Sequence, residues 1–302
     1  MKRSMVIVYL QLCFSVLTAC LTMRYRANFL PRSVMDGFAT VFMLTAIGVT
    51  FVSEVSLVLP GLVDGPLYWV QAVIGIFILF NILGNIFAVM RLDTSTHGLL
   101  LPASLKPGWR FCSACEATAP PRSWHCPICR ACILRRDHHC TFTGYCVGHF
   151  NQRHFLLFLA YLALGALYST VLNVIFIMRV VGGFHLLSLL QLVMPTAMLV
   201  FGLDVSPKQL YAFLFTLDLI GFLFVLALLL YHGQGALRGA TNYEKVHRQF
   251  QYDLGWKENL RQIFGTRWYL AVLSPAVHSP LPSDGISFTT AEQWRLEGDK
   301  HR

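Results

Sequence analysis

The sequence is short of charged residues. Asp, Glu, Lys and Arg together account for 13% of its 302 residues, whereas 55% are hydrophobic. Soluble globular domains usually carry about 25% charged residues. The segment 36–90 has no Lys or Arg and only three acidic residues. This scarcity argues against an ordinary soluble domain and favours a chain that is largely embedded in a lipid bilayer.

Four apolar runs are long enough to cross a bilayer, which takes about 20 helical residues. They occupy residues 37–59, 67–90, 155–178 and 209–231. Turn-forming or charged residues flank these runs, as expected where helices begin and end. We therefore predict a polytopic α-helical membrane protein with four core transmembrane helices.

The distribution of Lys and Arg predicts the orientation of these helices. The connection 60–66 has none of these residues, but there are eight in 91–154 and nine after residue 232. Because basic residues favour the cytosolic side, we expect 91–154 and the C-terminal tail in the cytosol and 60–66 on the opposite side. The net charge of +9 lies in clusters between apolar runs, which fits contact with anionic lipid and predicts no nucleic-acid partner.

Two other apolar runs leave the number of spans open. Residues 5–23 follow Lys2 and Arg3 and fit either a signal peptide or an extra span. Residues 186–203 contain Pro195, and a full span there would separate the basic tail from the 91–154 loop. We therefore expect 186–203 to be a lumenal or re-entrant segment.

The cysteines are concentrated in one short segment, since seven of the nine fall within residues 112–146 among several histidines. On a basic cytosolic loop, this density indicates metal binding rather than disulfides. The pattern C-x2-C-x9-H-x6-C occurs twice, and the second copy starts fourteen residues after the first. The two interleaved sets are Cys112, Cys115, His125 and Cys132, and Cys126, Cys129, His139 and Cys146.

Each set offers three thiolates and one imidazole, which match a closed tetrahedral structural zinc site. The sequence therefore predicts two structural Zn²⁺ ions, with unbound buried cysteines as the alternative. A loop rich in Pro, Gly and Arg builds little hydrophobic core. Each zinc ion would supply about 10 kcal/mol or more of folding free energy in its place.

Cys140 is left out of both sets. A third copy of the repeat starting there would need ligands at positions that hold Thr143, Arg153 and Ala160. Cys140 therefore has no metal partners. About fifteen residues separate it from the apolar run that begins at Phe155, so we expect the thiol near the membrane surface, where it suits a lipid-borne substrate.

Asp137 and His138 accompany this thiol in the sequence. An imidazole can take the thiol proton, a carboxylate can fix the histidine tautomer, and the nearby Arg135 and Arg136 favour the thiolate. The pattern predicts covalent catalysis at Cys140, with a spare structural cysteine as the alternative.

The segment Asp137-His138-His139-Cys140, inside this cysteine array, resembles the DHHC family of protein S-acyltransferases. The resemblance covers the cysteine-rich segment and the spans around it, and it is closest to shorter, divergent members without ankyrin repeats or SH3 domains. It implies a two-step reaction that uses acyl-CoA as co-substrate. Cys140 takes a long-chain fatty acyl group, expected to be palmitoyl, as a thioester and passes it to a membrane-proximal cysteine of a client protein.

The resemblance also implies individual roles and a location. His138 would be the base, Asp137 would polarise it, and His139 would be a zinc ligand. The protein would lie in the Golgi or endoplasmic reticulum membrane, with its catalytic domain on the cytosolic side.

The sequence departs from the family's secondary motifs at two places. The Asp-Pro-Gly turn after the second core span is replaced by Asp93-Thr94-Ser95, and the Thr-Thr-x-Glu motif by Thr241-Asn242-Tyr243-Glu244. Asn151 keeps its usual place after Cys146, and Asn259 matches a packing asparagine of the C-terminal segment. These departures concern rate and client choice more than the class of reaction.

We expect five regions along the chain. They are an N-terminal apolar segment and basic linker (1–36), the first two core helices (37–90), a cytosolic zinc-binding catalytic domain (91–154), further membrane helices (155–232) and a cytosolic tail (233–302).

Two other functions compete with the acyltransferase prediction. One is a catalytically inactive membrane protein that uses the zinc sites as a scaffold. The other is a transporter or channel, in which ionisable residues such as Glu54 and Asp218 would line a path through the membrane. Asp218 could instead hydrogen-bond between helices.

Overall fold

The computed structural model describes residues 24–27, 30–181 and 207–299. The apolar runs 5–23 and 186–203 lie outside the described residues. The chain divides into two compact units. One unit, which we call the hairpin unit, comprises Met1–Thr40, Gly84–Phe155 and His232–Arg302, and the other, the helical unit, comprises Val41–Leu83 and Leu156–Tyr231.

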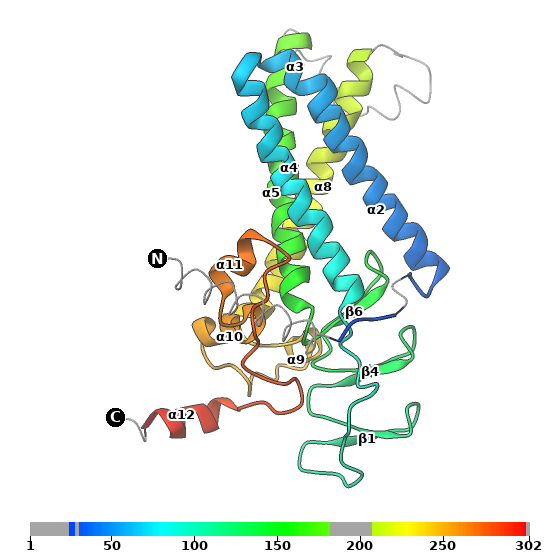
Figure 1. The fold of residues 1–302 in the computed structure, drawn as a ribbon, viewed down its shortest axis with the longest axis vertical. Helices are drawn as coiled ribbons and strands as arrows, with labels where there is room; N and C mark the ends of the chain where they lie inside the picture. The colour runs from blue at the N-terminus through cyan, green and yellow to red at the C-terminus, as the bar shows by residue number, and fades with distance from the viewer. Residues whose placement is uncertain (1–23, 28–29, 182–206, 300–302) are drawn as a thin grey trace, which may run out of the picture. The chain divides into compact units, whose positions relative to one another are not determined.

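Four helical segments have the length and apolar composition of membrane spans, namely Val34–Leu62, Gly65–Arg91, Gln152–Arg179 and Tyr211–Leu237. They are built from α2 (Val34–Ser53), η1 (Glu54–Val58), α3 (Leu59–Leu62), α4 (Gly65–Arg91), α5 (Gln152–Val181) and α8 (Pro207–Leu237) (Figure 1). The four predicted core helices are therefore confirmed.

Each helix extends beyond the apolar run that predicted it. Helix α8 continues to Leu237, six residues past the run 209–231, and ends shortly before Gly239. Gly239 has a φ of +61°, a backbone conformation that glycine adopts without strain and that commonly ends helices.

Apolar side chains cover much of the outside of the helical unit. Trp69, Val73 and Leu230 are 68%, 63% and 66% exposed. A soluble protein would leave such a surface in contact with water, whereas a bilayer solvates it with acyl chains. This surface is the one expected of a membrane-embedded bundle.

Polar side chains inside the helical unit bond to one another. The Ser169 hydroxyl lies 2.6 Å from Glu54 Oε1 and 2.6 Å from Asp218 Oδ2. Thr50 donates to Asp218 Oδ1 at 3.1 Å, and Asn173 Nδ2 also contacts Glu54. Polar groups in membrane helices commonly bond across helices in this way, so Glu54 and Asp218 both take part in interhelical hydrogen bonds.

The cysteine-rich segment folds into three two-stranded antiparallel hairpins. These are β1 (Arg110–Cys112) with β2 (Ala117–Ala119), β3 (Trp124–Cys126) with β4 (Ala131–Ile133), and β5 (His138–Cys140) with β6 (Tyr145–Val147) (Figure 1). Each strand has three residues, far too short for an independent sheet. Another source of stability is therefore required.

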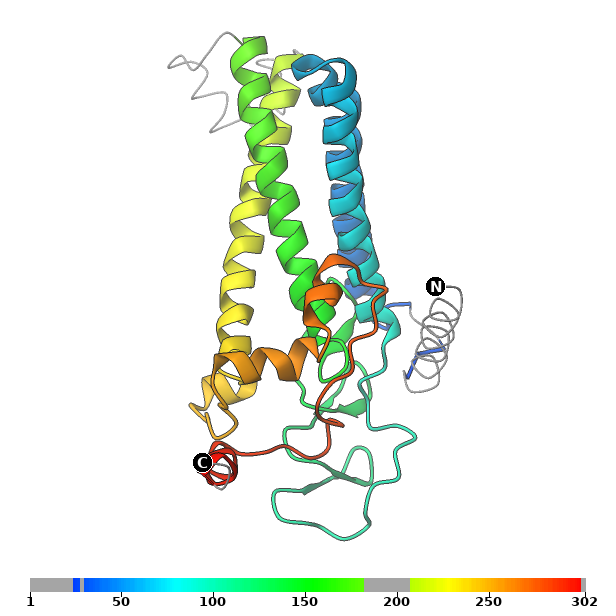
Figure 2. The same ribbon diagram turned by 60° about the vertical axis from the view of Figure 1, so that its left-hand side comes forward.

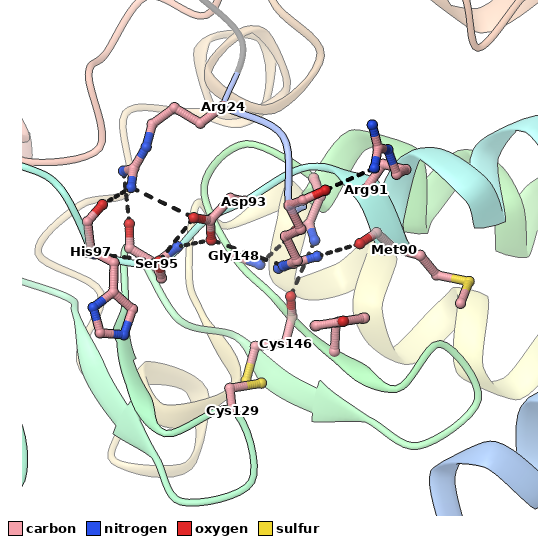
Figure 3. Close-up of polar contacts among 12 residues, drawn as sticks. Arg24, Met90, Arg91, Asp93, Ser95, His97, Cys129, Cys146 and Gly148 are labelled. Atoms are coloured by element: carbon pink, nitrogen blue, oxygen red, sulfur yellow. Dashed lines mark hydrogen bonds and ion pairs between the residues drawn. The ribbon is translucent and has the colours of Figure 1, made fainter. Parts of the chain in front are cut away.

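The turn after α4 is held by the chain's N-terminal segment. The Asp93 carboxylate accepts hydrogen bonds from the Ser95 N–H at 2.9 Å and the Ser95 hydroxyl at 3.0 Å. It also forms ion pairs with Arg24 at 3.6 Å and Arg26 at 3.9 Å, and Arg24 bonds onward to the Ser95 and His97 carbonyls (Figure 3). The Asp93-Thr94-Ser95 variant therefore still forms a closed, cross-linked turn.

The C-terminal part of the hairpin unit contains four helices among the described residues: α9 (Asn242–Val246), α10 (Trp256–Phe264), α11 (Trp268–Leu273) and α12 (Ala291–Asp299). Helix α10 runs close to the C-terminal end of α8 (Figure 2). The buried Asn259 joins them, because its Nδ2 donates to the Leu237 carbonyl at 2.8 Å and its Oδ1 accepts from the Leu254 N–H at 3.0 Å.

Candidate active site and metal centres

The structure brings together the eight predicted metal ligands in two groups. In each group, the ligand atoms lie within 4.8 Å of one another: Cys112, Cys115, His125 and Cys132 in the first, and Cys126, Cys129, His139 and Cys146 in the second. Within the groups, Cys115 Sγ lies 3.2 Å from His125 Nδ1, and Cys129 Sγ lies 3.4 Å from His139 Nδ1. Three thiols and one imidazole at this separation fit a tetrahedral zinc ion.

The hairpins explain why these residues meet. Residues His125 and Cys132 are directly opposite in the β3–β4 ladder, and His139 and Cys146 in the β5–β6 ladder. Opposite residues have their Cβ atoms about 5 Å apart. Each ladder therefore supplies a ready-made pair of ligands, and the preceding hairpin supplies the two cysteines of the C-x2-C pair.

The second group has an outer partner that the sequence did not suggest. His139 Nε2 lies 3.2 Å from Asp36 Oδ2, and Asp36 is only 2% exposed. A carboxylate on the far nitrogen of a zinc-binding histidine fixes the ring and strengthens the ligand. The only signal for it in the sequence is an acidic residue at the start of an apolar run, because the two residues are 103 positions apart.

Cys140 belongs to neither group and lies at the end of β5, beside His138. The His138 Nδ1 atom is 2.7 Å from Asp137 Oδ2. Cys140 is 8% exposed, and the His138 side chain is 21% exposed. The structure thus brings together the three predicted catalytic residues, with His138 between a carboxylate and a thiol.

The electrostatics of the three groups favour a thiolate–imidazolium pair. Burial alone would lower the pKa of His138, but its hydrogen bonds with Asp137 and Cys140 outweigh burial and raise the pKa to about 9. Burial would raise the pKa of Cys140, yet the neighbouring His138 holds it below the ordinary thiol value. Burial likewise opposes ionisation of Asp137, but His138 and His232 keep its pKa far below the usual range. The thiolate is the nucleophilic form of cysteine.

The β5–β6 hairpin repeats the geometry of the two hairpins before it. The ladder pairs Cys112–Ala117, Cys126–Ala131 and Cys140–Tyr145 are spaced by fourteen residues. Residues with positive φ recur at the same interval, at Glu116 (49°), Arg130 (52°) and Gly144 (68°). Cys140 therefore occupies the position at which the other hairpins hold the first cysteine of their C-x2-C pair.

Thr143 replaces the second cysteine of this third hairpin. In the second hairpin, the Cys129 N–H bonds to the Cys126 sulfur at 3.4 Å. In the third, the Thr143 N–H and hydroxyl donate to the Cys140 carbonyl at 3.2 and 3.4 Å, and the same two groups help to lower the pKa of the Cys140 thiol. The hairpin therefore retains hydrogen-bond donors near the thiol, although it lacks the second cysteine of a C-x2-C pair.

Sequence reasoning missed two further partners of Asp137. His232, near the end of α8, places Nδ1 3.3 Å from Asp137 Oδ2 and stacks on His138 with 4.7 Å between ring centroids. The Asn242 N–H donates to Asp137 Oδ1 at 2.9 Å. The only signal in the sequence was a histidine at the polar end of an apolar run. That signal did not predict a contact with Asp137, which lies 95 residues away in the chain.

The segment Thr241-Asn242-Tyr243-Glu244 links Asp137 to Arg122, which lies just before β3. Glu244 and Thr241 form a capping box at the start of α9. The same Glu244 carboxylate takes two hydrogen bonds from Arg122, each 2.7 Å long. Asn242 contributes its backbone N–H to Asp137, so the substituted motif still holds the carboxylate.

These features define a class of protein. A chain with membrane-spanning helices carries a buried cysteine next to a histidine–carboxylate pair, on a hairpin that also contributes to one of two Cys₃His groups that could hold zinc. Together, they describe a membrane protein with a thiol paired to a histidine, the arrangement used in covalent cysteine catalysis.

Comparison with known proteins identifies the family. The model of the DHHC palmitoyltransferase family matches residues 106–249. The chain is 42% identical to the probable palmitoyltransferase ZDHHC24 of Danio rerio over 216 residues, which cover 70% of this chain and 72% of the relative. It is 40% identical to the human ZDHHC24 over 226 residues (73% and 78%) and 32% identical to the mouse palmitoyltransferase ZDHHC22 over 269 residues (82% and 94%). The chain belongs to the DHHC palmitoyltransferase family, and the predicted protein S-acyltransferase activity is confirmed at this level.

Proposed function

We propose that Cys140 is the residue that carries the acyl group and that the acyl donor is a long-chain acyl-CoA. The observation that supports this assignment is the chain of contacts from Asp137 through His138 to Cys140. Among the cysteines that the structure describes, Cys140 alone lies in neither Cys₃His group.

The first step is attack of the Cys140 thiolate on the thioester carbonyl of acyl-CoA. The bond from the carbonyl carbon to the CoA sulfur breaks, and the CoA sulfur takes the proton from the His138 imidazolium. The products are free CoA and an acyl-enzyme thioester, so the protein itself is transiently lipid-modified. General acid catalysis of this kind contributes about 10² to 10⁴ in rate.

The second step transfers the acyl group to a client. The neutral His138 takes the proton from a cysteine thiol of the client protein, and the client sulfur attacks the Cys140 thioester. Cys140 leaves as a thiolate and is again paired with the His138 imidazolium. Asp137, held by His138, His232 and the Asn242 N–H, keeps the imidazole oriented and stabilises its charge in both steps.

The two Cys₃His groups would each hold one structural Zn²⁺. Bound zinc supplies folding free energy to hairpins that have little core of their own. Its ligands would be the eight residues of the two groups, and none of them takes part in the acyl transfer.

We further propose that residues 91–154 and 233–302 face the cytosol in a Golgi or endoplasmic reticulum membrane. The concentration of Lys and Arg in these two regions and their absence from 60–66 support the orientation, whereas the organelle rests only on the resemblance to the family. A cysteine introduced by Asp64→Cys should add to the labelling of wild type by a membrane-impermeant thiol reagent only after the microsomal membrane is opened. Additional label in sealed vesicles with their cytosolic face outward would contradict this orientation.

The test of the catalytic assignment is acylation of purified protein with labelled palmitoyl-CoA. Wild-type protein should become labelled, hydroxylamine should release the label, and Cys140→Ser should take up none. The zinc content of Cys140→Ser should stay at about two per chain. Hydroxylamine-labile label on correctly folded Cys140→Ser would place the acyl group on another cysteine, and no label on either protein would favour the inactive scaffold.

A further inference from the structure

Two carboxyl groups come close together inside the helical unit without a basic side chain beside them. Glu54 is the first residue of η1, and Asp218 lies in α8. Within the described part of the chain, no Lys, Arg or His forms an ion pair with either of them. A carboxylate among apolar helices is costly unless its charge is paired or removed. The helical unit therefore needs another way to accommodate these two acids.

The hydroxyl of Ser169, on α5, lies between the two carboxyl groups. Its Oγ is 2.6 Å from Glu54 Oε1 and 2.6 Å from Asp218 Oδ2, and both distances are typical of O–H···O hydrogen bonds. A hydroxyl has a single proton, so Ser169 can donate only one of these bonds. The proton of the other bond must come from a carboxyl group, because an ionised carboxylate can only accept. One of the two acids is therefore protonated.

The surroundings of the two acids assign this proton to Glu54. Asp218 is close to two further donors, since the Thr50 hydroxyl lies 3.1 Å from its Oδ1 and Asn173 Nδ2 lies 3.4 Å from its Oδ2. Asn173 also contacts Glu54 Oε1, which can accept this bond while its own proton points to Ser169. Glu54 Oε2, by contrast, is buried and has no hydrogen-bond partner among the described residues. An unpartnered oxygen costs less on a neutral carboxylic acid than on a carboxylate, so Glu54 is the acid and Asp218 the carboxylate.

The spacing of these oxygens fits a proton better than a metal ion. Mg²⁺ holds its ligand oxygens at about 2.1 Å in an octahedron, which puts neighbouring oxygens about 3 Å apart. The two contacts of Ser169 Oγ are both shorter, at 2.6 Å. A proton also needs no cavity, in agreement with the burial of Glu54, which is 7% exposed.

The backbone at Glu54 is also unusual. The segment η1 is a π-helix, and the Leu59 N–H bonds to the Glu54 carbonyl, five residues earlier. Single turns of π-helix are rare and occur frequently at functional sites. The widened turn begins at the residue that carries the proton, which supports a dedicated role for Glu54.

We propose that Glu54 is a proton-binding site among the membrane helices, and that its proton joins η1 to α5 and α8 through the Ser169 hydroxyl. Loss of the proton would leave two carboxylates to share the single proton of Ser169. Among the described residues, the other titratable group that acts on Glu54 is Tyr168 of α5, whose hydroxyl donates to Gln71 of α4. A lower pH would therefore favour the joined arrangement of these helices. This site is independent of the acyl transfer proposed for Cys140.

Infrared spectroscopy of the purified, zinc-loaded full chain detects the proton directly. At neutral pH, in a detergent without ester or carboxyl groups, wild type should show the C=O band of a protonated carboxylic acid. The band should shift in protein made with glutamate that carries carbon-13 in its side-chain carboxyl group, and stay in place in protein made with labelled aspartate. No band, or a band that shifts only with labelled aspartate, would overturn the proposal. Because this comparison needs no substitution, a folding defect cannot obscure it.

Two variants assign the band to a residue. Glu54→Gln should abolish it, because the amide cannot hold the proton. Asp64→Asn, which neutralises an exposed acid, is the matched control and should keep it. A band that persists in folded Glu54→Gln would place the proton on another residue and contradict the assignment to Glu54.

The pH dependence of stability tests whether the proton joins the helices. The unfolded chain releases this proton above about pH 4 to 5, where exposed carboxyl groups titrate, whereas the folded chain retains it. The unfolded state then binds fewer protons than the folded state, so stability falls as the pH rises. This proton should raise the unfolding constant by up to about tenfold per pH unit until the folded chain also releases it.

Reversible unfolding in a denaturing detergent measures this slope. Other groups titrate in the same range, so the informative quantity is the difference between variants. The unfolding constant of Glu54→Gln should rise less steeply with pH than that of wild type, by up to about one proton per chain, and Asp64→Asn should match wild type. Equal slopes in wild type and Glu54→Gln would show that the proton does not join the helices.

Discussion

The first two hairpins and the third share one backbone but do different chemistry. The ladder pairs and the positive-φ residues recur every fourteen residues through all three. The first two, β1–β2 and β3–β4, direct their C-x2-C cysteines into Cys₃His groups, whereas β5–β6 has Thr143 in place of its second cysteine. The comparison indicates that Cys140, the proposed nucleophile, stands where the other hairpins have the first cysteine of a C-x2-C pair, but without the second cysteine.

The difference also supports the proposed role of Cys140 as the nucleophile. A cysteine inside a closed tetrahedral site coordinates zinc through its sulfur, so that sulfur is not free to attack a substrate. Cys140 keeps the hydrogen-bond donors of such a position, through Thr143, and gains His138 in place of the ion as the source of positive charge. The surrounding zinc groups would then hold the hairpin rigid without touching the nucleophile.

Removing a predicted metal ligand from the second hairpin should have the largest effect on zinc content and stability. Cys126→Ser removes one of four ligands, and because each site supplies about 10 kcal/mol or more, we expect loss of about one zinc per chain together with most of the folded protein. Metal analysis and thermal unfolding of the purified variant measure both. Two zinc ions per chain and an unchanged Tm would mean that Cys126 is not a ligand.

Replacing His138 should leave the fold intact but slow catalysis strongly. His138→Gln should lower self-acylation by about 10² to 10⁴ because the proton donor and the positive charge are both lost. Without that charge the pKa of Cys140 rises, so alkylation by iodoacetamide should shift to higher pH. An alkylation profile identical to that of wild type would show that His138 does not stabilise the thiolate.

The outer partner of the second zinc group should have an intermediate effect. Asp36→Asn keeps the shape but removes the carboxylate that faces His139, and outer-partner changes typically weaken metal binding about 10- to 100-fold. Competition with a chelator measures it. Asp64→Asn, a change of the same kind at an exposed position, should release zinc like wild type. Equal zinc retention in the two variants would remove Asp36 from the site.

The smallest effect should come from substituting Thr143, which stands where the first two hairpins have their second cysteine. Thr143→Val keeps the volume and the backbone N–H but removes the hydroxyl near Cys140. A single hydrogen bond contributes about 0.5–1.5 kcal/mol, so self-acylation should slow about two- to tenfold with zinc content unchanged. A rate equal to wild type would mean that the backbone N–H alone supports the thiolate.

Much of this architecture was predictable from local patterns. Long apolar runs predicted the four helices, because burial in lipid leaves few alternatives for such segments. The fourteen-residue repeat predicted which eight residues meet, because identical spacing on identical hairpins produces identical ligand groups. The adjacency of Asp137, His138 and Cys140 predicted their contact for the same local reason.

The partners that come from distant segments were not predictable. Asp36 reaches His139 across 103 residues, and His232 reaches Asp137 from the end of α8. No periodicity encodes such meetings, because they depend on how the helix ends pack against the hairpins. In the sequence, only the positions of the Cys and His residues revealed the repeat, and these positions stop matching at Cys140. In the structure, the backbone of β5–β6 repeats the hairpin once more.

That third copy has a consequence for how such a site could arise in evolution. Tandem duplication of a metal-binding hairpin, followed by loss of the second cysteine of the C-x2-C pair in one copy, leaves a thiol already close to hydrogen-bond donors and held on a rigid frame. Only a histidine beside it is then needed for chemistry. The proposed active site would then have arisen when one metal-binding hairpin lost a cysteine, while the other hairpins kept theirs and continued to support the fold.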